Sequence, residues 1–356
     1  MMKIDLAELQ KRIDEGLINK KKHPEHDIYI YNYSIGCQFD KKWDEYTRIS
    51  RGLILDPYGY VISKPFEKFF NLNEMPESSI EKILKKGKPV ITEKLDGSLG
   101  IMYFHKGDMG IATRGSFEGE QAVWATNWAK NNINLHEIKH SYTYLFEIIY
   151  PENRIVVDYG DRAELVLLAM ISKVDGTEEN YIEKHAEQIG VKYVKFYDFT
   201  LSEAIKLLPG LKGTEQEGFV AKFKDGSRVK LKADEYFLLH KTLNALSSVS
   251  IWECLKNNIE IGNLGINRYP ELESWVKEVE GELRYQYFSV EITAKRIFNE
   301  IKDMETRKEQ ALYLKEHAPD LLGIVFNMID HKSWNKLIWK KIKPETSKLK
   351  WIGGEK

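Results

Sequence analysis

The chain contains very little cysteine. Cys37 and Cys254 are the only two in 356 residues, they lie far apart, and neither has histidine or cysteine neighbours at the spacing of a metal site. This composition excludes a disulfide scaffold and argues against a structural zinc site. We therefore expect a protein of a reducing compartment, the cytoplasm.

Long apolar runs and a surplus of charge are also missing. No run approaches the roughly 18 apolar residues that a membrane span needs, and residues 1–5 lead into a charged amphipathic helix, not into an apolar signal core. We expect no membrane partner and no export. Because the formal net charge is −1, any attraction of a polyanion must come from a local basic patch.

The remaining composition is that of a globular protein, with 42% hydrophobic and 30% charged residues and enough length for two domains. As far as Ala233 the pattern predicts short alternating strands, hairpins and a few helices. Beyond Ala233 the periodicity is almost entirely helical. We predict a first, strand-rich domain over residues 1–240, a helical domain over residues 241–356, and a frayed tail over 347–356.

One stretch places a lysine directly before an Asp-Gly turn: Glu93-Lys94-Leu95-Asp96-Gly97-Ser98. The pattern predicts strands over residues 88–93 and 99–104, so Lys94 is expected at a strand end facing a tight turn. Burial and nearby cations can turn such an amine into a nucleophile. The pattern Lys-x-Asp-Gly occurs by chance in about one chain in ten of this length, and a second copy at Lys173 is explained by turn chemistry alone.

Other charged residues strengthen the case for Lys94, because they too stand at strand ends or hairpins beside glycine or aromatic residues. A single such lysine is a solvated surface charge in about four cases of five. Several cations that converge with two carboxylates and one lysine, however, suit a nucleoside triphosphate. The set consists of Arg51, Lys68, Arg114, Glu147, Glu217, Lys222, Lys230 and Lys232.

The order and wording of these segments resemble the covalent nucleotidyltransferase superfamily of ligases and capping enzymes. Within it they are similar to the bacteriophage-type RNA ligase 1 family, whose members seal single-stranded RNA breaks, notably in tRNA. Two positions depart from the family pattern: Leu95 stands where an acid is common, and Arg114 replaces a lysine. The matching segments run from Tyr33 to Tyr236 and read Arg51-Gly52, Glu67-Lys68-Phe69-Phe70-Asn71-Leu72, Glu93-Lys94-Leu95-Asp96-Gly97-Ser98, Arg114-Gly115-Ser116, Phe146-Glu147, Glu217-Gly218-Phe219-Val220-Ala221-Lys222 and Val229-Lys230-Leu231-Lys232.

The resemblance implies an α+β fold: an antiparallel-sheet nucleotidyltransferase (ATP-grasp-like ligase) domain followed by an all-helical C-terminal domain that serves RNA specificity. It implies that Lys94 attacks ATP and carries AMP, which then passes to an RNA 5′-phosphate before a 3′-hydroxyl displaces it. Glu217 would hold the metal, Mg²⁺ with Mn²⁺ as a substitute. The residues expected around the ATP cofactor are Tyr33, Arg51, Lys68, Phe70, Gly97, Arg114, Glu147, Lys230, Lys232 and Tyr236.

The same resemblance implies the partners: RNA with 5′-phosphate and 3′-hydroxyl ends, such as a broken tRNA, and an end-healing kinase/phosphatase. The expected location is the cytoplasm of a bacterial or phage-infected cell.

Two alternatives remain, one within the superfamily and one from a different class. A DNA ligase or an mRNA capping enzyme would carry a β-barrel OB domain after the second lysine pair, where this sequence is helical. A non-catalytic RNA-binding module would use the basic residues for phosphate contact alone. Incubation with labelled ATP separates these classes, since only an enzyme becomes covalently labelled.

Overall fold

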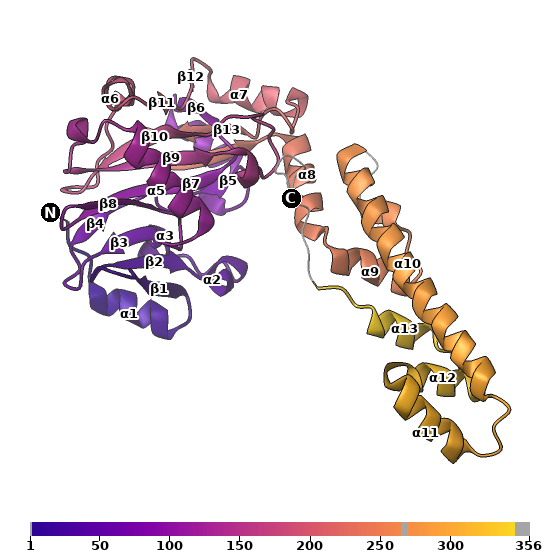
Figure 1. The fold of residues 1–356 in the computed structure, drawn as a ribbon. Helices are drawn as coiled ribbons and strands as arrows, with labels where there is room; N and C mark the ends of the chain where they lie inside the picture. Colours follow the sequence, from indigo (N-terminus) through magenta and orange to yellow (C-terminus); the bar gives the residue numbers. More distant parts are fainter. Residues whose placement is uncertain (1, 265–269, 346–356) are drawn as a thin grey trace. The chain divides into compact units, whose positions relative to one another are not determined.

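The structure is a computed structural model that describes residues 2–264 and 270–345. It divides into two compact units, the first ending at Leu239 and the second beginning at His240 (Figure 1). The predicted tail over residues 347–356 lies outside the described residues.

The first sheet has the strand order β1-β2-β3-β4, and all its neighbouring strands are antiparallel. Helix α1 (Leu6–Asp14) packs on this sheet through Leu9, which lies in one apolar cluster with Tyr31 and Leu53. The predicted helix is confirmed, and the predicted hairpin after Arg51 forms β3 and β4. The strand bounds are β1 Ile18–Lys22, β2 Tyr29–Tyr33, β3 Arg51–Leu55 and β4 Val61–Ser63.

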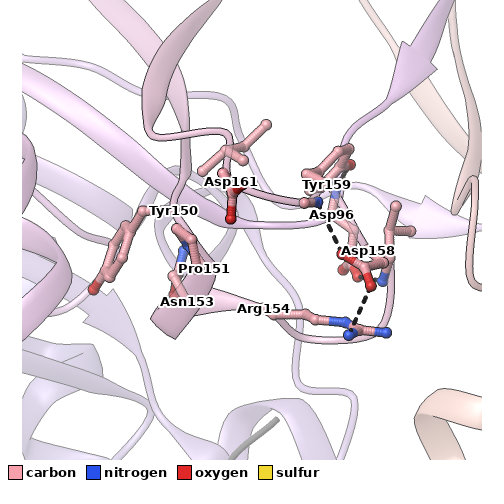
Figure 2. Close-up of a pocket in the computed structure, with 11 residues that line it drawn as sticks. Asp96, Tyr150, Pro151, Asn153, Arg154, Asp158, Tyr159 and Asp161 are labelled. Carbon is pink, nitrogen blue, oxygen red and sulfur yellow. Dashed lines mark hydrogen bonds and ion pairs between the residues drawn. The ribbon is translucent and has the colours of Figure 1, made fainter. Parts of the chain in front are cut away.

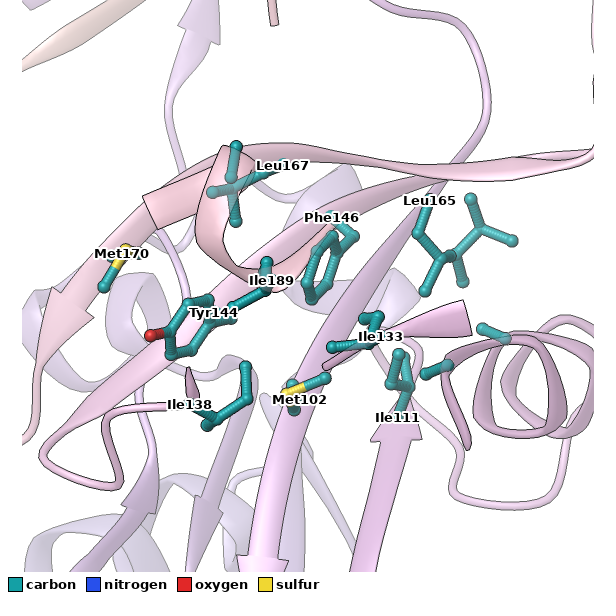
Figure 3. Packing of buried hydrophobic residues seen from close by; sticks show 14 of the residues in the cluster. Met102, Ile111, Ile133, Ile138, Tyr144, Phe146, Leu165, Leu167, Met170 and Ile189 are labelled. Carbon is teal, nitrogen blue, oxygen red and sulfur yellow. The ribbon is translucent and has the colours of Figure 1, made fainter. Parts of the chain in front are cut away.

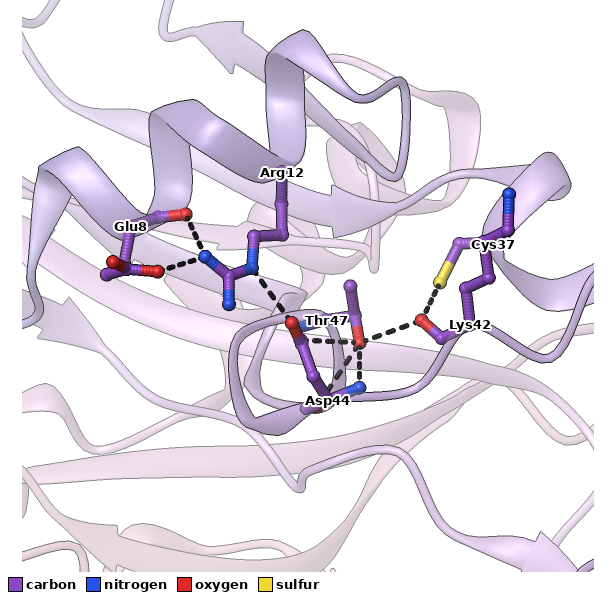
Figure 4. Close-up of polar contacts among 6 residues, drawn as sticks. All are labelled: Glu8, Arg12, Cys37, Lys42, Asp44 and Thr47. Atoms are coloured by element: carbon purple, nitrogen blue, oxygen red, sulfur yellow. Dashed lines mark hydrogen bonds and ion pairs between the residues drawn. The ribbon is translucent and has the colours of Figure 1, made fainter.

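Two short helices, α2 (Ile35–Phe39) and α3 (Glu45–Ile49), connect β2 to β3. A polar contact ties α3 to α1, because Arg12 donates from Nε to Asp44 Oδ2 at 2.8 Å (Figure 4). Asp44 in turn forms a capping box with Thr47 at the start of α3. The backbone that enters β3 is therefore fixed just before the strand begins.

The second sheet has the order β11-β10-β9-β7-β8, and only its β10–β11 pair is parallel. Helices α5 (Glu120–Asn132) and α6 (Ile182–Ile189) contribute to the core on this sheet, in which Tyr144, Phe146 and Leu165 are fully buried (Figure 3). The strand bounds are β7 Ser98–His105, β8 Asp108–Ala112, β9 Tyr142–Ile149, β10 Glu164–Ser172 and β11 Lys192–Tyr193.

The third sheet has the order β12-β6-β13-β14-β5, with β14 and β5 parallel. Helices α4 (Ile80–Ile83) and α7 (Leu201–Leu207) supply Ile83 and Leu201 to its core, where they meet Phe219. The predicted hairpin after Glu217 is confirmed as β13 and β14. The strand bounds are β5 Phe70–Asn71, β6 Val90–Lys94, β12 Phe196–Tyr197, β13 Gly218–Lys222 and β14 Arg228–Lys232.

The prediction that Lys94 stands at a strand end is confirmed. The Asp96-Gly97 link after it does not connect paired strands, because β6 lies in the third sheet and β7 in the second. There is no room for a side chain at Gly97, because a Cβ there would lie 2.5 Å from the carbonyl oxygen of Ile148 in β9. The link that follows Lys94 is therefore a crossing between two sheets.

The unit after His240 is helical in its described residues, as the sequence predicted. One apolar cluster of this unit gathers Ile297, Leu314, Val325 and Ile338 from four helices. Among the described residues no helix is both long enough and apolar enough to cross a bilayer. The helix bounds are α8 Asp234–Ala245, which begins in the first unit, α9 Ser248–Lys256, α10 Pro270–Ile301, α11 Arg307–His317, α12 Leu322–Ile329 and α13 Asn335–Lys341.

Candidate active site

Strand pairing brings Lys94 to a buried carboxylate. Lys94 ends β6 directly opposite Gly218 of β13. Gly218 has a φ of +138°, and a Cβ there would collide with the carbonyl oxygen of Leu231, so only glycine fits. The residue before it, Glu217, accepts an ion pair from Lys94, with Nζ and Oε2 2.5 Å apart.

Glu217 serves a second lysine at the same time. Lys232 of β14 lies 2.8 Å from Glu217 Oε1, so both carboxylate oxygens are paired, and the residue is only 2% exposed. Burial works to raise the pKa of Glu217, but the charges of Lys94 and Lys232 lower it below its ordinary value. Glu217 is therefore a carboxylate held ionised between two cations.

Lys94 is a protonated amine in this arrangement. Burial works to lower the pKa of Lys94, yet the charges of Glu217 and Glu147 and the hydrogen bond to Glu217 raise it above its ordinary value. A nucleophilic amine needs a free electron pair. Lys94 can attack only after Glu217 is engaged elsewhere or the proton has left.

Glu147 is the second carboxylate near Lys94. It lies in β9 opposite Leu99 of β7 and Val166 of β10, and its Cγ is 3.2 Å from the position of a Cβ on Gly97. Burial raises the pKa of Glu147 to about 8, although the charge of Lys94 opposes this. The raised pKa favours the protonated carboxyl group, which can donate a hydrogen bond as well as accept one.

Two cations without carboxylate partners lie near Lys94. The Nη1 of Arg51 is buried and has no hydrogen-bond partner in the described part of the chain. Burial, together with the charges of Arg51 and Lys94, lowers the pKa of Lys230 well below its ordinary value. Both cations lie over the ring of Phe69, Arg51 Cζ at 5.7 Å and Lys230 Nζ at 4.9 Å from its centroid. An anion placed between them would satisfy the unpaired donors.

These groups line one cavity of about 230 Å³. Of the residues expected around the nucleotide, Arg51, Lys94, Gly97, Glu147 and Lys230 line it. Glu217 contacts the lining through Lys94, and Lys232 contacts Glu217; neither residue belongs to the lining itself.

Four further predicted residues form a neighbouring cluster and do not line this cavity. Arg114 donates from Nη1 to the hydroxyl of Tyr33 at 2.9 Å. Lys68 Nζ lies 5.2 Å from the ring centroid of Tyr33 and 5.3 Å from that of Phe70. Phe70 is 3% exposed and packs beneath Lys68. It was expected beside the nucleotide, but it does not line the cavity.

Tyr236 lies farther from the cavity as well. Its hydroxyl donates to Asp96 Oδ1 at 2.6 Å, while Oδ2 of Asp96 accepts from the backbone N–H groups of Val156 and Val157, each at 2.8 Å. Asp96 also lines a second cavity, of about 170 Å³, together with Tyr159 (Figure 2). Tyr236 thus positions the link after Lys94 through Asp96.

Sequence reasoning missed several lining residues. Phe66 and Phe69 line the cavity instead of Phe70, because Phe70 starts β5 and turns into the core. Glu178, which holds Lys222 at 2.9 Å and also pairs with Arg228, comes from a loop without any sequence signal. Asn32 has a buried Oδ1 that lacks a partner among the described residues, and it lies opposite Arg51 in β2.

The fit of a divalent metal rests on Glu217. The described residues hold no group of three or more histidine, cysteine, aspartate or glutamate side chains that could bind a metal ion by themselves. Mg²⁺ is commonly held by one or two carboxylates, waters and substrate phosphates, and a buried ionised carboxylate beside Lys94 suits that mode. Glu217 would have to exchange a lysine for the metal, since both its oxygens are paired.

A family model described as RNA ligase matches residues 49–242, more than half of the chain. A protein of Rhodothermus phage RM378 named RNA ligase is 28% identical over 209 residues, which cover 48% of this chain and 45% of that protein. A protein of Autographa californica nuclear polyhedrosis virus named putative bifunctional polynucleotide kinase/RNA ligase is 26% identical over 379 residues, covering 93% of this chain and 53% of its own length. The chain spans about half the length of these relatives.

Among solved structures, the chain is similar to a Naegleria gruberi RNA ligase variant with ATP and Mn. The TM-score is 0.38 at 18% identity, and the match covers 46% of this chain and 55% of the other.

Proposed function

Because the chain belongs to the phage-type RNA ligase family, whose model matches residues 49–242, we propose that it is an ATP-dependent RNA ligase. It joins a 5′-phosphate to a 3′-hydroxyl in single-stranded or nicked-loop RNA, through a lysyl-AMP and an RNA-adenylate. The observation that carries this proposal is the ion pair of the buried Glu217 with Lys94, because Lys94 lines the same cavity as Arg51, whose Nη1 has no partner among the described residues.

The first step transfers AMP to the protein. After losing a proton, Lys94 Nζ attacks the α-phosphorus of ATP, the bond to the bridging oxygen breaks, and pyrophosphate leaves with that electron pair. Arg51 and Lys230 are suited to the phosphate oxygens, where negative charge develops. Glu147 is suited to the ribose hydroxyls, because its raised pKa lets it donate as well as accept a hydrogen bond.

Two further steps complete the reaction. The RNA 5′-phosphate oxygen attacks the phosphorus of the phosphoramidate and releases the amine of Lys94. The RNA 3′-hydroxyl then loses its proton, attacks the 5′-phosphorus of the RNA-adenylate and expels AMP. Mg²⁺, or Mn²⁺ in its place, would supply charge neutralisation at the phosphates, with Glu217 as its protein ligand.

The roles of the neighbouring cluster follow from its donors. Arg114, Lys68 and Tyr33 lie together outside the lining of the 230 Å³ cavity. We assign them to the outer phosphates of ATP or to the RNA end. Lys232 keeps Glu217 ionised when Lys94 is occupied with AMP, because it pairs with the other carboxylate oxygen.

The experiment incubates the protein with ATP labelled at the α-phosphate and then adds RNA. We expect an acid-labile covalent label, which moves to a 5′-phosphorylated RNA and disappears as the RNA is sealed to a 3′-hydroxyl strand. A protein that binds RNA but takes up no label would be a non-catalytic RNA-binding module. Sealing of nicked DNA in preference to RNA would favour the DNA ligase alternative, which the family match and the helices after Lys232 do not favour.

The helical unit is our candidate for RNA selection. A cavity of about 430 Å³ on this unit is lined by Arg284, Phe288 and Trp339, and cations beside aromatic rings suit unpaired bases. Replacing Arg284 and Phe288 by alanine should lower sealing of a broken anticodon stem-loop relative to an unstructured oligonucleotide. An unchanged ratio between the two substrates would assign this unit to structural support.

The proposal also includes a partner enzyme that prepares the RNA ends and a cellular compartment. A relative is named as a kinase/RNA ligase, which supports a partner kinase/phosphatase that supplies 5′-phosphate and 3′-hydroxyl ends, such as those of a broken tRNA. Cys37 and Cys254 are both buried free thiols, which supports a reducing cytoplasm.

A further inference from the structure

A basic groove adjoins the candidate active site. It has a volume of about 960 Å³, roughly four times that of the 230 Å³ cavity. The two spaces share lining residues, among them Phe66, Phe69, Glu178 and Arg228. Material bound at Lys94 can therefore continue into the groove.

The groove carries an excess of positive charge. Eight lysine and arginine side chains line it, against four aspartate and glutamate side chains. This local patch is strong for a protein whose formal net charge is −1. Lys224 forms no ion pair among the described residues, and Lys68 meets aromatic rings rather than a carboxylate.

Two of the groove lysines are paired with exposed carboxylates. Lys86 pairs with Asp225 at 2.7 Å and Lys88 with Asp198 at 2.8 Å, and the two carboxylate side chains are 53% and 93% exposed. Exposed pairs of this kind contribute about 0–1 kcal/mol. A phosphate can replace such a carboxylate at little cost, which makes these lysines available to a polyanion.

The far end of the groove lies beyond the reach of ATP. Lys88 and Lys224 stand near the opposite end of the β6–β13 pair from Lys94, since Val90 pairs with Lys222 and Lys94 with Gly218. The four steps from Val90 to Lys94 span roughly 13 Å of strand. A triphosphate whose α-phosphorus is at Lys94 leaves the lysines beyond Val90 without a ligand.

We propose that the basic groove binds the 5′-phosphorylated RNA strand as a single strand, with its backbone phosphates at Lys86, Lys88 and Lys224. This inference rests on the proposed function and deepens it. When the 5′ end of the strand is joined to AMP in the cavity, the nucleotides behind it must leave the cavity, and the groove is continuous with it and complementary in charge.

The test compares two triple variants of the full chain. The groove variant carries Lys86→Ala, Lys88→Ala and Lys224→Ala. The control variant carries Lys11→Ala, Lys130→Ala and Lys184→Ala, three exposed lysines of the same unit that line neither the groove nor the cavity. Both variants are first checked for an unchanged melting temperature.

Binding of a pre-adenylylated single strand is measured at several salt concentrations, beside lysyl-AMP formation from ATP. We expect the groove variant to bind at least ten-fold more weakly, and the slope of log K against log salt to fall by about 2, since each lost phosphate contact removes about 0.7. Lysyl-AMP formation should stay within two-fold of the unsubstituted protein. The control variant should match the unsubstituted protein in both assays.

Three outcomes would overturn the proposal. Equal RNA affinity of the two variants would remove the groove from RNA binding. An equal loss of lysyl-AMP formation would assign the groove lysines to the triphosphate, and weakening confined to a 3′-hydroxyl strand would assign them to the other substrate. Failure of the unsubstituted protein to form lysyl-AMP would contradict the proposed function instead, and the binding comparison would still decide whether the groove holds RNA.

Discussion

The pattern Lys-x-Asp-Gly occurs twice in the chain, and the two copies have opposite surroundings. Lys94 reaches the buried carboxylate of Glu217 at 2.5 Å. Lys173 is 7% exposed and has no ion pair in the described residues. Burial lowers the pKa of Lys173 to about 8, whereas the carboxylates near Lys94 raise its pKa.

The two aspartates differ in the same way. Asp96 accepts hydrogen bonds from the backbone of Val156 and Val157, which come from a distant part of the chain. Asp175 accepts from Thr177 within its own turn. By acidity alone Lys173 would be the better nucleophile at neutral pH. A low pKa is therefore not sufficient to select the lysine, because of these two lysines only Lys94 stands in a cavity with cations that suit phosphates.

The largest expected effect separates the two lysines directly. Lys94→Ala should abolish the covalent AMP label, while Lys173→Ala should retain it, because only Lys94 lies in the cavity with Arg51 and Lys230. The measurement is labelling by ATP carrying a radioactive α-phosphate. Equal labelling of the two variants would contradict the assignment of Lys94 as the residue that carries AMP.

The next effect tests the carboxylate that Lys94 has and Lys173 lacks. Glu217→Gln should slow lysyl-AMP formation by about 10²–10³-fold, typical for a lost electrostatic partner of the reacting groups. Because Glu217 raises the pKa of Lys94, the acid limb of the rate profile should move to lower pH in the variant. Glu164→Gln, which removes a paired carboxylate outside the cavity lining, is the control. A slower rate without a shift in the acid limb of the pH–rate profile would mean that Glu217 does not control the protonation of Lys94.

A smaller effect concerns the two aspartates and the stability of the fold. Asp96→Ala should lower the free energy of unfolding by roughly 2–4 kcal/mol, because the buried N–H groups of Val156 and Val157 lose their acceptor. Asp175→Ala should shift the urea midpoint much less, since Asp175 is exposed. Similar midpoints for the two variants would mean that the Asp96 contacts do not stabilise the crossing between the sheets.

The smallest effect is a gain. The folded protein holds Lys173 with a pKa of about 8, below the unfolded value of about 10.4, so the unfolded chain binds more protons in this window. Stability should therefore rise with pH between about 8 and 10.4, and the buried charge should cost its full amount below pH 8. Lys173→Met should stabilise the protein at pH 7 by at most about 3 kcal/mol. In urea unfolding, the advantage should shrink toward pH 10; a constant advantage would contradict the burial of a charged amine.

Local patterns were sufficient for much of the fold. The hairpin of β13 and β14 was predictable because Asp225-Gly226 separates two alternating runs, and the helices after Ala233 followed from their periodicity. The same patterns predicted β6 and β7 but not that they belong to different sheets, because alternation defines the two faces of a strand and leaves its partner open. Which strands pair is decided by packing between segments far apart in the sequence.

The candidate site was predictable to a similar degree. Arg51 beside a glycine, Glu147 as a lone acid in an apolar strand and Lys230 on a hairpin could be picked out from the sequence. All three line one cavity. Phe69 was missed because the sequence does not show which of two adjacent phenylalanines faces the cavity. Phe70 is buried because it begins β5. Glu178 was missed since its position depends on a loop that the sequence does not encode by periodicity.

The contact at Gly97 limits how this site can be redesigned. A Cβ there would lie 2.5 Å from the carbonyl oxygen of Ile148, so the backbone of the crossing rests directly on the backbone of the second sheet. The distance between the crossing and β9 at this point is therefore set by the van der Waals radii of main-chain atoms. Substitutions of lining side chains can change which ligand the cavity binds. Widening the cavity beside Gly97 would require a different backbone path for the crossing itself.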